Sequence, residues 1–366
     1  MGYKDRTVLF QQIEQLRERP LVAYVTSIRP GLSGMMAGDA VRPIIDQLDL
    51  IPKEKKKVDF LIISNGGDPI AAMRIVGLLR ERFDEVSVLL PYVAYSAATI
   101  LSLGADEIVM HPYSNLGPVD PQLDVTHKNA DGQTEKIQFG SEDIVNFIEF
   151  IKKDVGITDQ QHLIASIKPL IDQVGSLSIG NAKRGQRLSL SLSERMLNSH
   201  IDDPSKVSTI AKALNSSYYH HGYAVGRKEA KSIGLPITEP DGLLEDLLWK
   251  VWLDYENEMK CSTEFNVVRE ILDDPNSGPI VKRITTINIP ANLPDAQKQA
   301  VYNQVASSVC VTQQQSIVLS PLVASIESVN CAKAVYNEIA INYWRDVTMN
   351  LKFNVTFAGT GWVDYK

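Results

Sequence analysis

Two glycines and one serine have the residue types and the spacing of a site for acyl transfer. Gly66 and Gly67 end an apolar run that starts at Phe60, and Ser96 follows Gly66 by 30 residues. This spacing fits one β-α-β unit, which would bring the glycine turn and the serine to the same edge of a sheet. Glycine permits turns with positive φ that leave backbone N–H groups open to a ligand. A serine at a strand-to-helix junction exposes its hydroxyl beside the free N–H groups of the helix start. The pattern therefore indicates a nucleophile with an oxyanion hole.

Strands alternating with helices are expected to position these residues. Short apolar runs predict buried strands, and apolar stripes predict helices between them. Such alternation predicts an α/β fold with a parallel sheet, whose sites lie at the carboxyl ends of the strands. The predicted strands are residues 20–26, 58–64, 86–91 and 107–110, and the predicted helices are residues 7–18, 41–50, 68–82 and 96–103.

The remainder of the chain predicts a second part with a different pattern. Residues 123–139 form a polar segment that we interpret as a loop and a possible lid, and residues 140–260 are mostly helical in pattern. A run rich in Asp, Pro and Gly at 273–279 indicates a linker. Beyond it we expect a strand at 280–289, a helical stretch and an alternating strand at 351–357. The predicted domains are 1–260, a linker at 261–279, and a small α/β appendage of unknown role at 280–366.

Composition and charge exclude several classes of protein. The chain has 366 residues, 44% hydrophobic and 22% charged, which is typical of a globular protein with a sizeable core. Its net charge of −7 gives no basic footprint for nucleic acid. Three cysteines without CxxC spacing argue against a disulfide framework or a zinc site. No signal peptide or membrane-spanning run is evident, so we expect a cytoplasmic protein. Neither GxGxxG nor a phosphate-binding loop is present, and we expect no cofactor.

Several motifs occur in an order that resembles a known family. In chain order they are Ser64-Asn-Gly-Gly-Asp-Pro-Ile-Ala-Ala-Met, Ser96-Ala-Ala-Thr, Gly104-Ala-Asp-Glu-Ile-Val-Met, Gly117-Pro-Val-Asp-Pro-Gln122, His221-Gly-Tyr-Ala-Val and Glu229-Ala-Lys-Ser-Ile-Gly-Leu235. Together they resemble the serine dehydrogenase proteinase family of the Clp/crotonase superfamily, which is related to signal peptide peptidase A and the Clp protease subunit. The resemblance covers residues 7 to 260, and the last hundred residues have no counterpart in it.

The resemblance implies a fold, an activity and roles for named residues. The fold would be a crotonase-like (ClpP-like) spiral of ββα units with helical additions, assembling as a homo-oligomer built from trimers or larger rings. The activity would be that of an ATP-independent serine peptidase that cuts peptides or unfolded protein segments through an acyl-enzyme. Ser96 would be the nucleophile, the N–H groups of Gly67 and Ala97 the oxyanion donors, and Gly66 the turn residue that makes this arrangement possible.

The general base is the part that the sequence leaves open. The superfamily uses either a histidine with an aspartate or a single lysine, and residues 112–120 contain no histidine at the position where the Clp protease has one. Asp120 stands there instead, and His221 lies where the Clp aspartate is found. Because triads depend on geometry and not on sequence order, we hypothesise Ser96–His221–Asp120. A dyad with Lys183 is the alternative, since a desolvated lysine can act as a base.

Other interpretations of the same residues also stay open. A non-catalytic oligomeric scaffold or sensor could use the same fold. A crotonase-type acyl-CoA enzyme could use the same oxyanion hole, although such enzymes usually need an acidic base and only Asp68 is near the glycine pair. Taken singly, Ser96 could be a helix N-cap, and Gly66–Gly67 an ordinary turn. His111, His127, His162 and His200 have no motif context, and we assign them no role.

Overall fold

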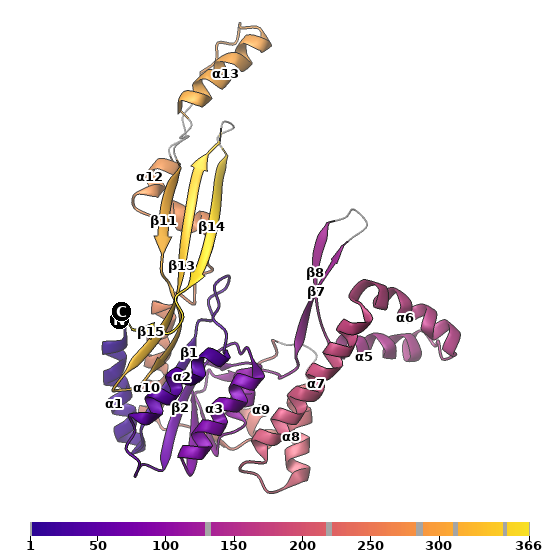
Figure 1. Ribbon diagram of the computed structural model, residues 1–366, viewed down its shortest axis with the longest axis vertical. Coiled ribbons are helices and arrows are strands. Elements are labelled where there is room, and N and C mark those ends of the chain that lie inside the picture. Colours follow the sequence, from indigo (N-terminus) through magenta and orange to yellow (C-terminus); the bar gives the residue numbers. More distant parts are fainter. Residues whose placement is uncertain are drawn as a thin grey trace. The chain divides into compact units, whose positions relative to one another are not determined.

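The structure is a computed structural model that describes residues 2–128, 133–216, 222–282, 288–309, 314–346 and 350–365. Figure 1 shows its elements, which form two compact units. We call Met1–Thr26, Met35–Asp254 and Ile326–Cys331 the core unit. We call Ser27–Gly34, Tyr255–Ser325 and Ala332–Lys366 the second unit. These boundaries differ from the predicted ones, because each unit takes residues from both sides of the predicted linker at 261–279.

The core unit is built on a parallel sheet, as predicted for an α/β protein. Its strands follow the order β10-β5-β3-β2-β1 and all pair in parallel. Every residue of β1 and nearly all of β2 and β3 are buried, which explains their continuous apolar sequences. The strands are β1 (Leu21–Thr26), β2 (Lys57–Ile63), β3 (Glu85–Leu90), β5 (Glu107–Met110) and β10 (Ile237–Thr238).

Helices join these strands where the apolar stripes predict them. The start of α3 shows why: Asp68 accepts a hydrogen bond from the N–H of Ile70 at 2.8 Å, and Pro69 fills the first helical position. The helices of the core unit are α1 (Tyr3–Arg17), the 3₁₀ turn η1 (Gly38–Ala40), α2 (Val41–Asp49), α3 (Pro69–Arg82), α4 (Ala97–Ser102), α5 (Ser141–Glu149), the π-helical turn η2 (Phe150–Asp154), α6 (Gln160–Val174), α7 (Ser176–Leu197), α8 (Pro204–Ser216), α9 (Arg227–Ser232) and α10 (Gly242–Glu258), whose last turns belong to the second unit.

Residues 122–128 and 134–140 form the two strands of a hairpin, which corrects the prediction of a polar loop at 123–139 in its described part. β7 (Gln122–Lys128) and β8 (Thr134–Gly140) pair in antiparallel register. The polar residues of this segment alternate with apolar ones, and the apolar side chains pack on one cluster. That cluster contains Leu123, Val125, Ile137, Phe139, Val174 and Ala182. The hairpin thus has one apolar face that helices α6 and α7 cover.

A buried ion network ties the C-terminal part of the sequence into the core unit. Arg6 of α1 donates to Asp254 of α10 and to Glu327 at 2.7 Å each. The three side chains are almost completely buried, so each charge needs its partner. Glu327 lies in β12 (Leu322–Glu327), of which Ile326 and Glu327 belong to the core unit. Sequence patterns give no signal for this distant contribution.

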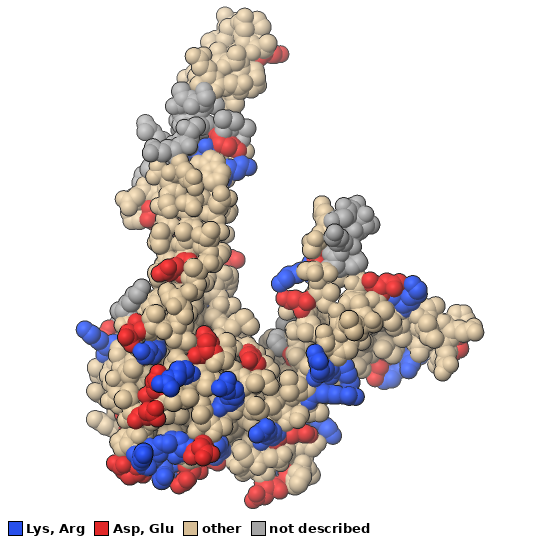
Figure 2. All heavy atoms as spheres, viewed as in Figure 1, with Lys and Arg blue, Asp and Glu red and all other residues tan. Residues whose placement is uncertain are grey.

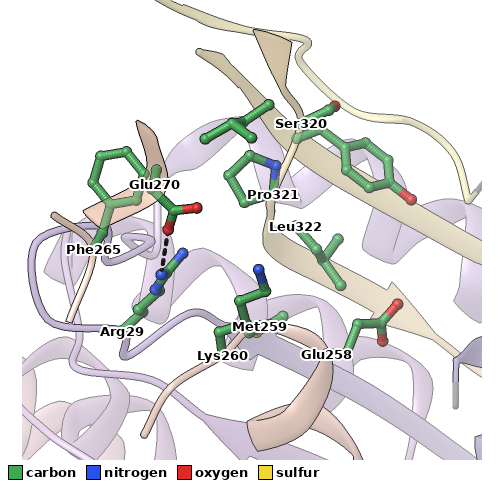
Figure 3. Close-up of a pocket in the computed structure, with 11 residues that line it drawn as sticks. Arg29, Glu258, Met259, Lys260, Phe265, Glu270, Ser320, Pro321 and Leu322 are labelled. Carbon is green, nitrogen blue, oxygen red and sulfur yellow. Dashed lines mark hydrogen bonds and ion pairs between the residues drawn. The ribbon is translucent and has the colours of Figure 1, made fainter. Parts of the chain in front are cut away.

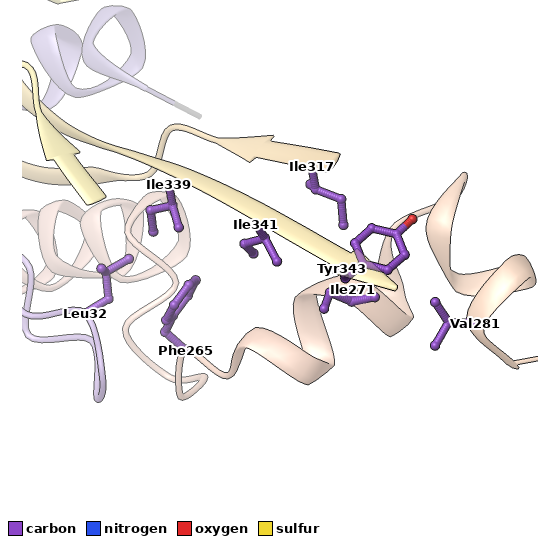
Figure 4. Packing of buried hydrophobic residues seen from close by; sticks show 8 residues of the cluster. All are labelled: Leu32, Phe265, Ile271, Val281, Ile317, Ile339, Ile341 and Tyr343. Carbon is purple, nitrogen blue, oxygen red and sulfur yellow. The ribbon is translucent and has the colours of Figure 1, made fainter. Parts of the chain in front are cut away.

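The second unit contains an antiparallel sheet with an apolar core on one face. β13 (Ala332–Arg345) pairs with β11 (Gln315–Leu319), β14 (Leu351–Gly359) and β15 (Val363–Asp364). Helices α11 (Val267–Asp273), α12 (Ser277–Lys282) and α13 (Asp295–Val309) complete the unit. Figure 4 shows its buried cluster: Leu32, Phe265, Ile271, Val281, Ile317, Ile339, Ile341 and Tyr343. The predicted strand at 351–357 is confirmed as part of β14.

The predicted strand at 280–289 is wrong in its described part. Residues 280–282 end helix α12, and 283–287 lie outside the described residues. The segment contains β-branched residues that favour a strand, but Val281 packs from a helix against the cluster of the second unit. Tertiary packing has overridden local propensity here.

A cavity of about 320 Å³ lies in the second unit (Figure 3). Arg29 at its wall donates to Glu270 at 2.9 Å and to the carbonyl oxygen of Thr263 at 2.8 Å. Of the residues predicted to form the acyl-transfer site, those that the structure describes do not line this cavity.

Two features bear on binding to nucleic acids and membranes: the distribution of surface charge and the hydropathy of the helices. Figure 2 shows basic and acidic side chains interspersed over the core unit on the viewed face, with no extended basic patch there. Among the helices that the structure describes, none combines the length and hydropathy of a transmembrane segment.

Candidate active site

Ser96 occupies a strained turn between β4 (Val93–Ala94) and helix α4. Its φ of 51° and ψ of −117° lie in a region that non-glycine residues rarely adopt. Such strain costs about 1–3 kcal/mol and is typical of functional sites. The hydroxyl makes no capping hydrogen bond to the helix that it precedes. The side chain therefore does not perform the ordinary task of a serine at a helix start, and its turn has the form of a nucleophile elbow.

The glycine turn lies directly against this elbow. Gly66 and Gly67 have φ values of 100° and 145°, which side chains rarely permit. A Cβ atom added to Gly66 would lie 2.8 Å from the Cβ of Ser96 and 2.5 Å from the carbonyl oxygen of Tyr95. A Cβ atom added to Gly67 would lie 2.2 Å from the carbonyl oxygen of Met36. The structure thus brings the glycine pair and Ser96 together, and only glycine fits at either position.

Ser64 fastens the two turns to each other. Its N–H donates to the carbonyl oxygen of Val93 at 3.0 Å, and its carbonyl oxygen accepts from the N–H of Tyr95 at 3.0 Å. Its hydroxyl accepts from the N–H of Gly66 at 3.0 Å and from Thr26 Oγ1 at 2.7 Å. We assigned Ser64 no role from the sequence. The sequence feature that could have indicated its role is its position: Ser64 is a polar residue directly after a buried strand and just before a glycine turn.

The residues that follow Gly66 and Ser96 each have a backbone N–H group that donates to no residue that the structure describes. Met36 donates to the carbonyl oxygen of Gly66 at 2.7 Å and accepts from the N–H of Asp68 at 2.8 Å. The N–H of Gly67 lies between these two bonds in sequence. Across the described ranges, neither it nor the N–H of Ala97 donates a hydrogen bond to the protein. Two N–H donors without an acceptor, next to a serine in a tight turn, are the kind of groups that can hold a developing oxyanion.

Thr99 and Gly117 fix the elbow from the other side. Thr99 Oγ1 lies 2.7 Å from the carbonyl oxygen of Ala94 and 2.9 Å from that of Gly117. A Cβ atom on Gly117 would lie 2.4 Å from Cδ1 of Tyr95, so Gly117 packs against the residue before Ser96. The Tyr95 hydroxyl donates to Asn115, and burial raises its pKa. The segment that follows α4 is therefore held against the elbow.

Replacing Thr99 with valine is expected to weaken the elbow. The change keeps the shape but removes the hydroxyl between two buried carbonyl oxygens. The Ala94 oxygen keeps the N–H of Gly117 as a donor, whereas the Gly117 oxygen loses its hydroxyl partner, which costs about 1–3 kcal/mol. Urea unfolding should show this loss in the free energy of unfolding, and peptide turnover should fall with it. Thr99→Ser keeps the hydroxyl and is the matched control. Equal values for the two variants would contradict the positioning role of Thr99.

Asp120 lies three residues after Gly117 and is half-buried. Its carboxylate accepts a hydrogen bond from Gln122 Nε2 at 2.8 Å. The preceding residue, Val119, donates through its N–H to the carbonyl oxygen of Leu214 at 3.0 Å and accepts from the Ser189 hydroxyl. Asp120 therefore stands on a segment that is fixed both to the elbow and to helices α7 and α8.

His221 lies outside the described residues, but the chain on both sides of it is placed. On one side Leu214, near the end of α8, bonds to Val119. On the other side β9 (Val225–Gly226) pairs with β6 (Asn115–Leu116), which pairs in turn with β4 before Ser96. Both described flanks are thus attached to the segment that connects Ser96 to Asp120.

Lys183, the alternative base, lies on the exposed surface of α7. Its ammonium group donates to Gln186 Oε1 at 2.8 Å. No hydrogen bond joins it to Ser96 in the part of the chain that the structure describes. A lysine that serves as a base is usually desolvated, and these surroundings do not provide that.

The histidines that we gave no role have structural partners where their side chains are described. His111 stacks on Trp249 with ring centroids 5.0 Å apart, and its Nδ1 accepts from the N–H of Tyr113. His200 contacts the carbonyl oxygen of Leu103 at 2.9 Å. Burial lowers the pKa of both imidazoles. The described residues contain no group of three or more His, Cys, Asp or Glu side chains that could hold a metal ion.

Comparison with known proteins identifies the segment that carries this site. Residues 35–173 match the family described as ClpP-like SDH-type serine proteinase. The resemblance found in the sequence motifs is confirmed over this segment, which contains Gly66, Gly67, Ser96 and Asp120. His221 and Lys183 lie outside it.

Two curated relatives come from Methanocaldococcus jannaschii, and both are described as uncharacterized proteins. One is 28% identical over 198 residues, which are 53% of this chain and 57% of that protein. The other is 24% identical over 197 residues, which are 53% of this chain and 56% of that protein. The match therefore spans a little more than half the length of each relative.

Two solved structures also show similarity to this chain. One is a mutant of the 1510-N membrane-bound stomatin-specific protease, with 15% identity and a TM-score of 0.33, covering 62% of this chain and 82% of that one. The other is ClpP1 from Listeria monocytogenes, with 14% identity and a TM-score of 0.33, covering 64% of this chain and 99% of that one. The similarity of residues 35–173 to the proteinase family is a match of sequence.

Proposed function

We propose that this protein is a serine peptidase with Ser96 as its nucleophile, because residues 35–173 match the ClpP-like SDH-type serine proteinase family. One observation carries the proposal: Ser96 has a φ of 51° in a turn that packs against Gly66. A strained serine whose hydroxyl caps no helix, next to N–H groups that donate to no described residue, supports a nucleophile with an oxyanion hole.

The proposed reaction proceeds through an acyl-enzyme. The Ser96 hydroxyl oxygen attacks the carbonyl carbon of a peptide bond while the general base takes its proton. The N–H groups of Gly67 and Ala97 donate to the oxyanion that forms. The base then gives the proton to the leaving amine as the C–N bond breaks. Water, deprotonated by the same base, attacks the acyl-enzyme and releases the acid and Ser96.

We propose His221 as the general base, with Asp120 to orient it. The support is topological: the described chain before and after His221 is attached to residues 115–119, next to Asp120. Lys183 remains the alternative, and its exposed position favours it less. Substrates are proposed to be peptides or unfolded protein segments, and assembly as a homo-oligomer is proposed from the family.

The base can be identified by comparing two alanine variants. We expect His221→Ala to lower kcat/KM by about 10³-fold or more and Lys183→Ala to leave it nearly unchanged, since a serine hydroxyl is a poor nucleophile without its base. Initial rates on a fluorogenic peptide library provide the measurement. With a histidine base, kcat/KM should also fall towards acid pH, because the protonated imidazole accepts no proton. Full turnover in His221→Ala with loss in Lys183→Ala would contradict the triad.

The peptidase activity itself is tested on an unfolded protein without ATP. Mass spectrometry of the native chain with reduced, unfolded casein should show new peptide termini that accumulate with time. Intact substrate after long incubation of the assembled protein, across several unfolded proteins, would favour a non-catalytic scaffold. Tight binding of coenzyme A without cleavage would favour an acyl-CoA enzyme.

A further inference from the structure

β14 forms an outer strand of the second unit's sheet (Figure 1). It pairs with β13 from Asn337↔Gly359 to Arg345↔Leu351, while β11 pairs with β13 on the other side. Among the strands that the structure describes, β14 has no neighbour except β13. One row of its N–H and C=O groups is therefore available to another strand.

This edge has few of the features that usually prevent strand pairing. Natural edges carry charges, prolines or bulges, whereas β14 contains no proline and a single charged residue, Lys352. Lys352 lies near the start of the strand, 3.7 Å from Asp346. Figure 2 shows the surface over β13 and β14 to be largely uncharged. Two phenylalanines of this strand, Phe353 and Phe357, are 40% and 56% exposed.

We propose that β14 pairs with β14 of a second copy of this chain, antiparallel and centred on Val355. This register joins residue 351 to residue 359 of the other copy and uses all nine residues of the strand. It places Phe353 opposite Phe357 of the partner subunit, and the two-fold axis repeats that aromatic pair. Lys352 faces Ala358 of the partner subunit, so the two ammonium groups do not meet.

The neighbouring strand supplies charge complementarity for the same register. Glu338 of β13 is exposed and pairs directly with Ala358 of β14. Lys352 of the partner subunit would lie on the other side of Ala358. The small alanine leaves room for the carboxylate and the long lysine side chain to approach each other across it. The described residues offer Glu338 no ion pair within its own chain.

Other registers and other occupants fit this edge less well. Moving the centre to Thr356 leaves Leu351 and Lys352 outside the ladder and separates the two aromatic side chains. An unrelated extended peptide would gain the backbone ladder but would match the phenylalanines and Glu338 only by chance. A second copy supplies the Phe353–Phe357 pair and the Lys352–Glu338 pair, each twice because of the two-fold axis. The proposal is independent of the peptidase activity.

Cysteine cross-linking of the full chain tests the register. Val355→Cys places two thiols on the proposed axis, so mild oxidation or a short bis-maleimide should give a covalent dimer on a non-reducing gel. Ala358→Cys is the matched control, because its two thiols would be about 20 Å apart at 3.3 Å per residue. We expect at least tenfold more dimer for Val355→Cys than for the control or the native chain. Equal amounts in all three would overturn the proposal.

Charge substitution provides a second test that does not depend on one variant. Phe353→Lys with Phe357→Lys puts like charges opposite each other, and sedimentation velocity should show loss of the assembly that uses β14. Mixing it with the Phe353→Glu, Phe357→Glu variant should restore that assembly. Val318→Lys, on the opposite face of the sheet, should change nothing. An unchanged mass of the assembly in both phenylalanine variants would overturn pairing between copies. So would protection of the β14 amides from exchange by an unrelated peptide, if Val355→Cys gave no cross-link.

Discussion

Replacing Ser96 with alanine is expected to abolish peptide hydrolysis while the protein stays folded. Removal of the nucleophile typically lowers kcat by about 10³-fold or far more. The Ser96 hydroxyl makes no capping bond, so stability should change little. Initial rates on the best library peptide and thermal melting measure the two effects. Ser102→Ala, which removes a hydroxyl bonded to the Ala98 carbonyl oxygen in the same helix, is the control and should keep its rate.

A glycine at the same position separates strain from chemistry. Because Ser96 has a φ of 51°, Ser96→Gly should relieve strain and raise the free energy of unfolding by about 1 kcal/mol, although it is equally inactive. Urea unfolding of the alanine and glycine variants provides the comparison. Turnover by Ser96→Ala within tenfold of the native rate would contradict the nucleophile. A glycine variant less stable than the alanine variant would contradict the strained turn.

Adding a methyl group to the glycine turn is expected to damage both activity and stability. In Gly66→Ala the new Cβ would meet the Tyr95 carbonyl oxygen at 2.5 Å and the Ser96 Cβ at 2.8 Å. The backbone must move, at a cost of about 2–5 kcal/mol from clash and positive φ together. Displacing the Gly67 N–H should also lower kcat by 10²–10³, the range for losing one oxyanion donor. Gly67→Ala should behave similarly, since its Cβ would meet the Met36 carbonyl oxygen.

Gly77→Ala is the matched control for these variants. Gly77 lies inside α3 with nothing within 4 Å of an added Cβ. Alanine should therefore stabilise this helix by about 0.5–1 kcal/mol and leave turnover unchanged. Urea unfolding and initial rates on all three variants give the measurement. If Gly66→Ala and Gly77→Ala matched in both stability and rate, the close contact between the glycine turn and Ser96 would be wrong.

The parts of the fold that follow local rules could be predicted from the sequence. The four strands predicted up to residue 110 are short buried apolar runs, and each is found within a residue of its predicted limits, whereas the two-residue strand β4 was not predicted. Ser96 and the glycine pair were placed at one sheet edge because parallel strands end on the same side. Their contact could be expected, but the φ of 51° at Ser96 could not, since serine has no local preference for it.

The remaining differences come from contacts between residues distant in sequence. The sequence of strands β7 and β8 has the polar composition of a loop, because their apolar face is recognisable only beside Val174 and Ala182. Glu327 enters the core unit through Arg6, which is 321 residues away. Val281 is helical although its neighbours favour a strand. The role of Ser64 could not be predicted, because it consists of four hydrogen bonds to residues from three separate segments of the chain.

The central claim is that Ser96 is an activated nucleophile beside an oxyanion hole. Its most direct test is to react the native protein with a fluorophosphonate and to map the adduct by peptide mass spectrometry. We predict stoichiometric phosphonylation of Ser96, strongly reduced in Gly66→Ala and unchanged in Gly77→Ala. No adduct on the assembled protein, or an adduct on a different residue, would contradict the claim.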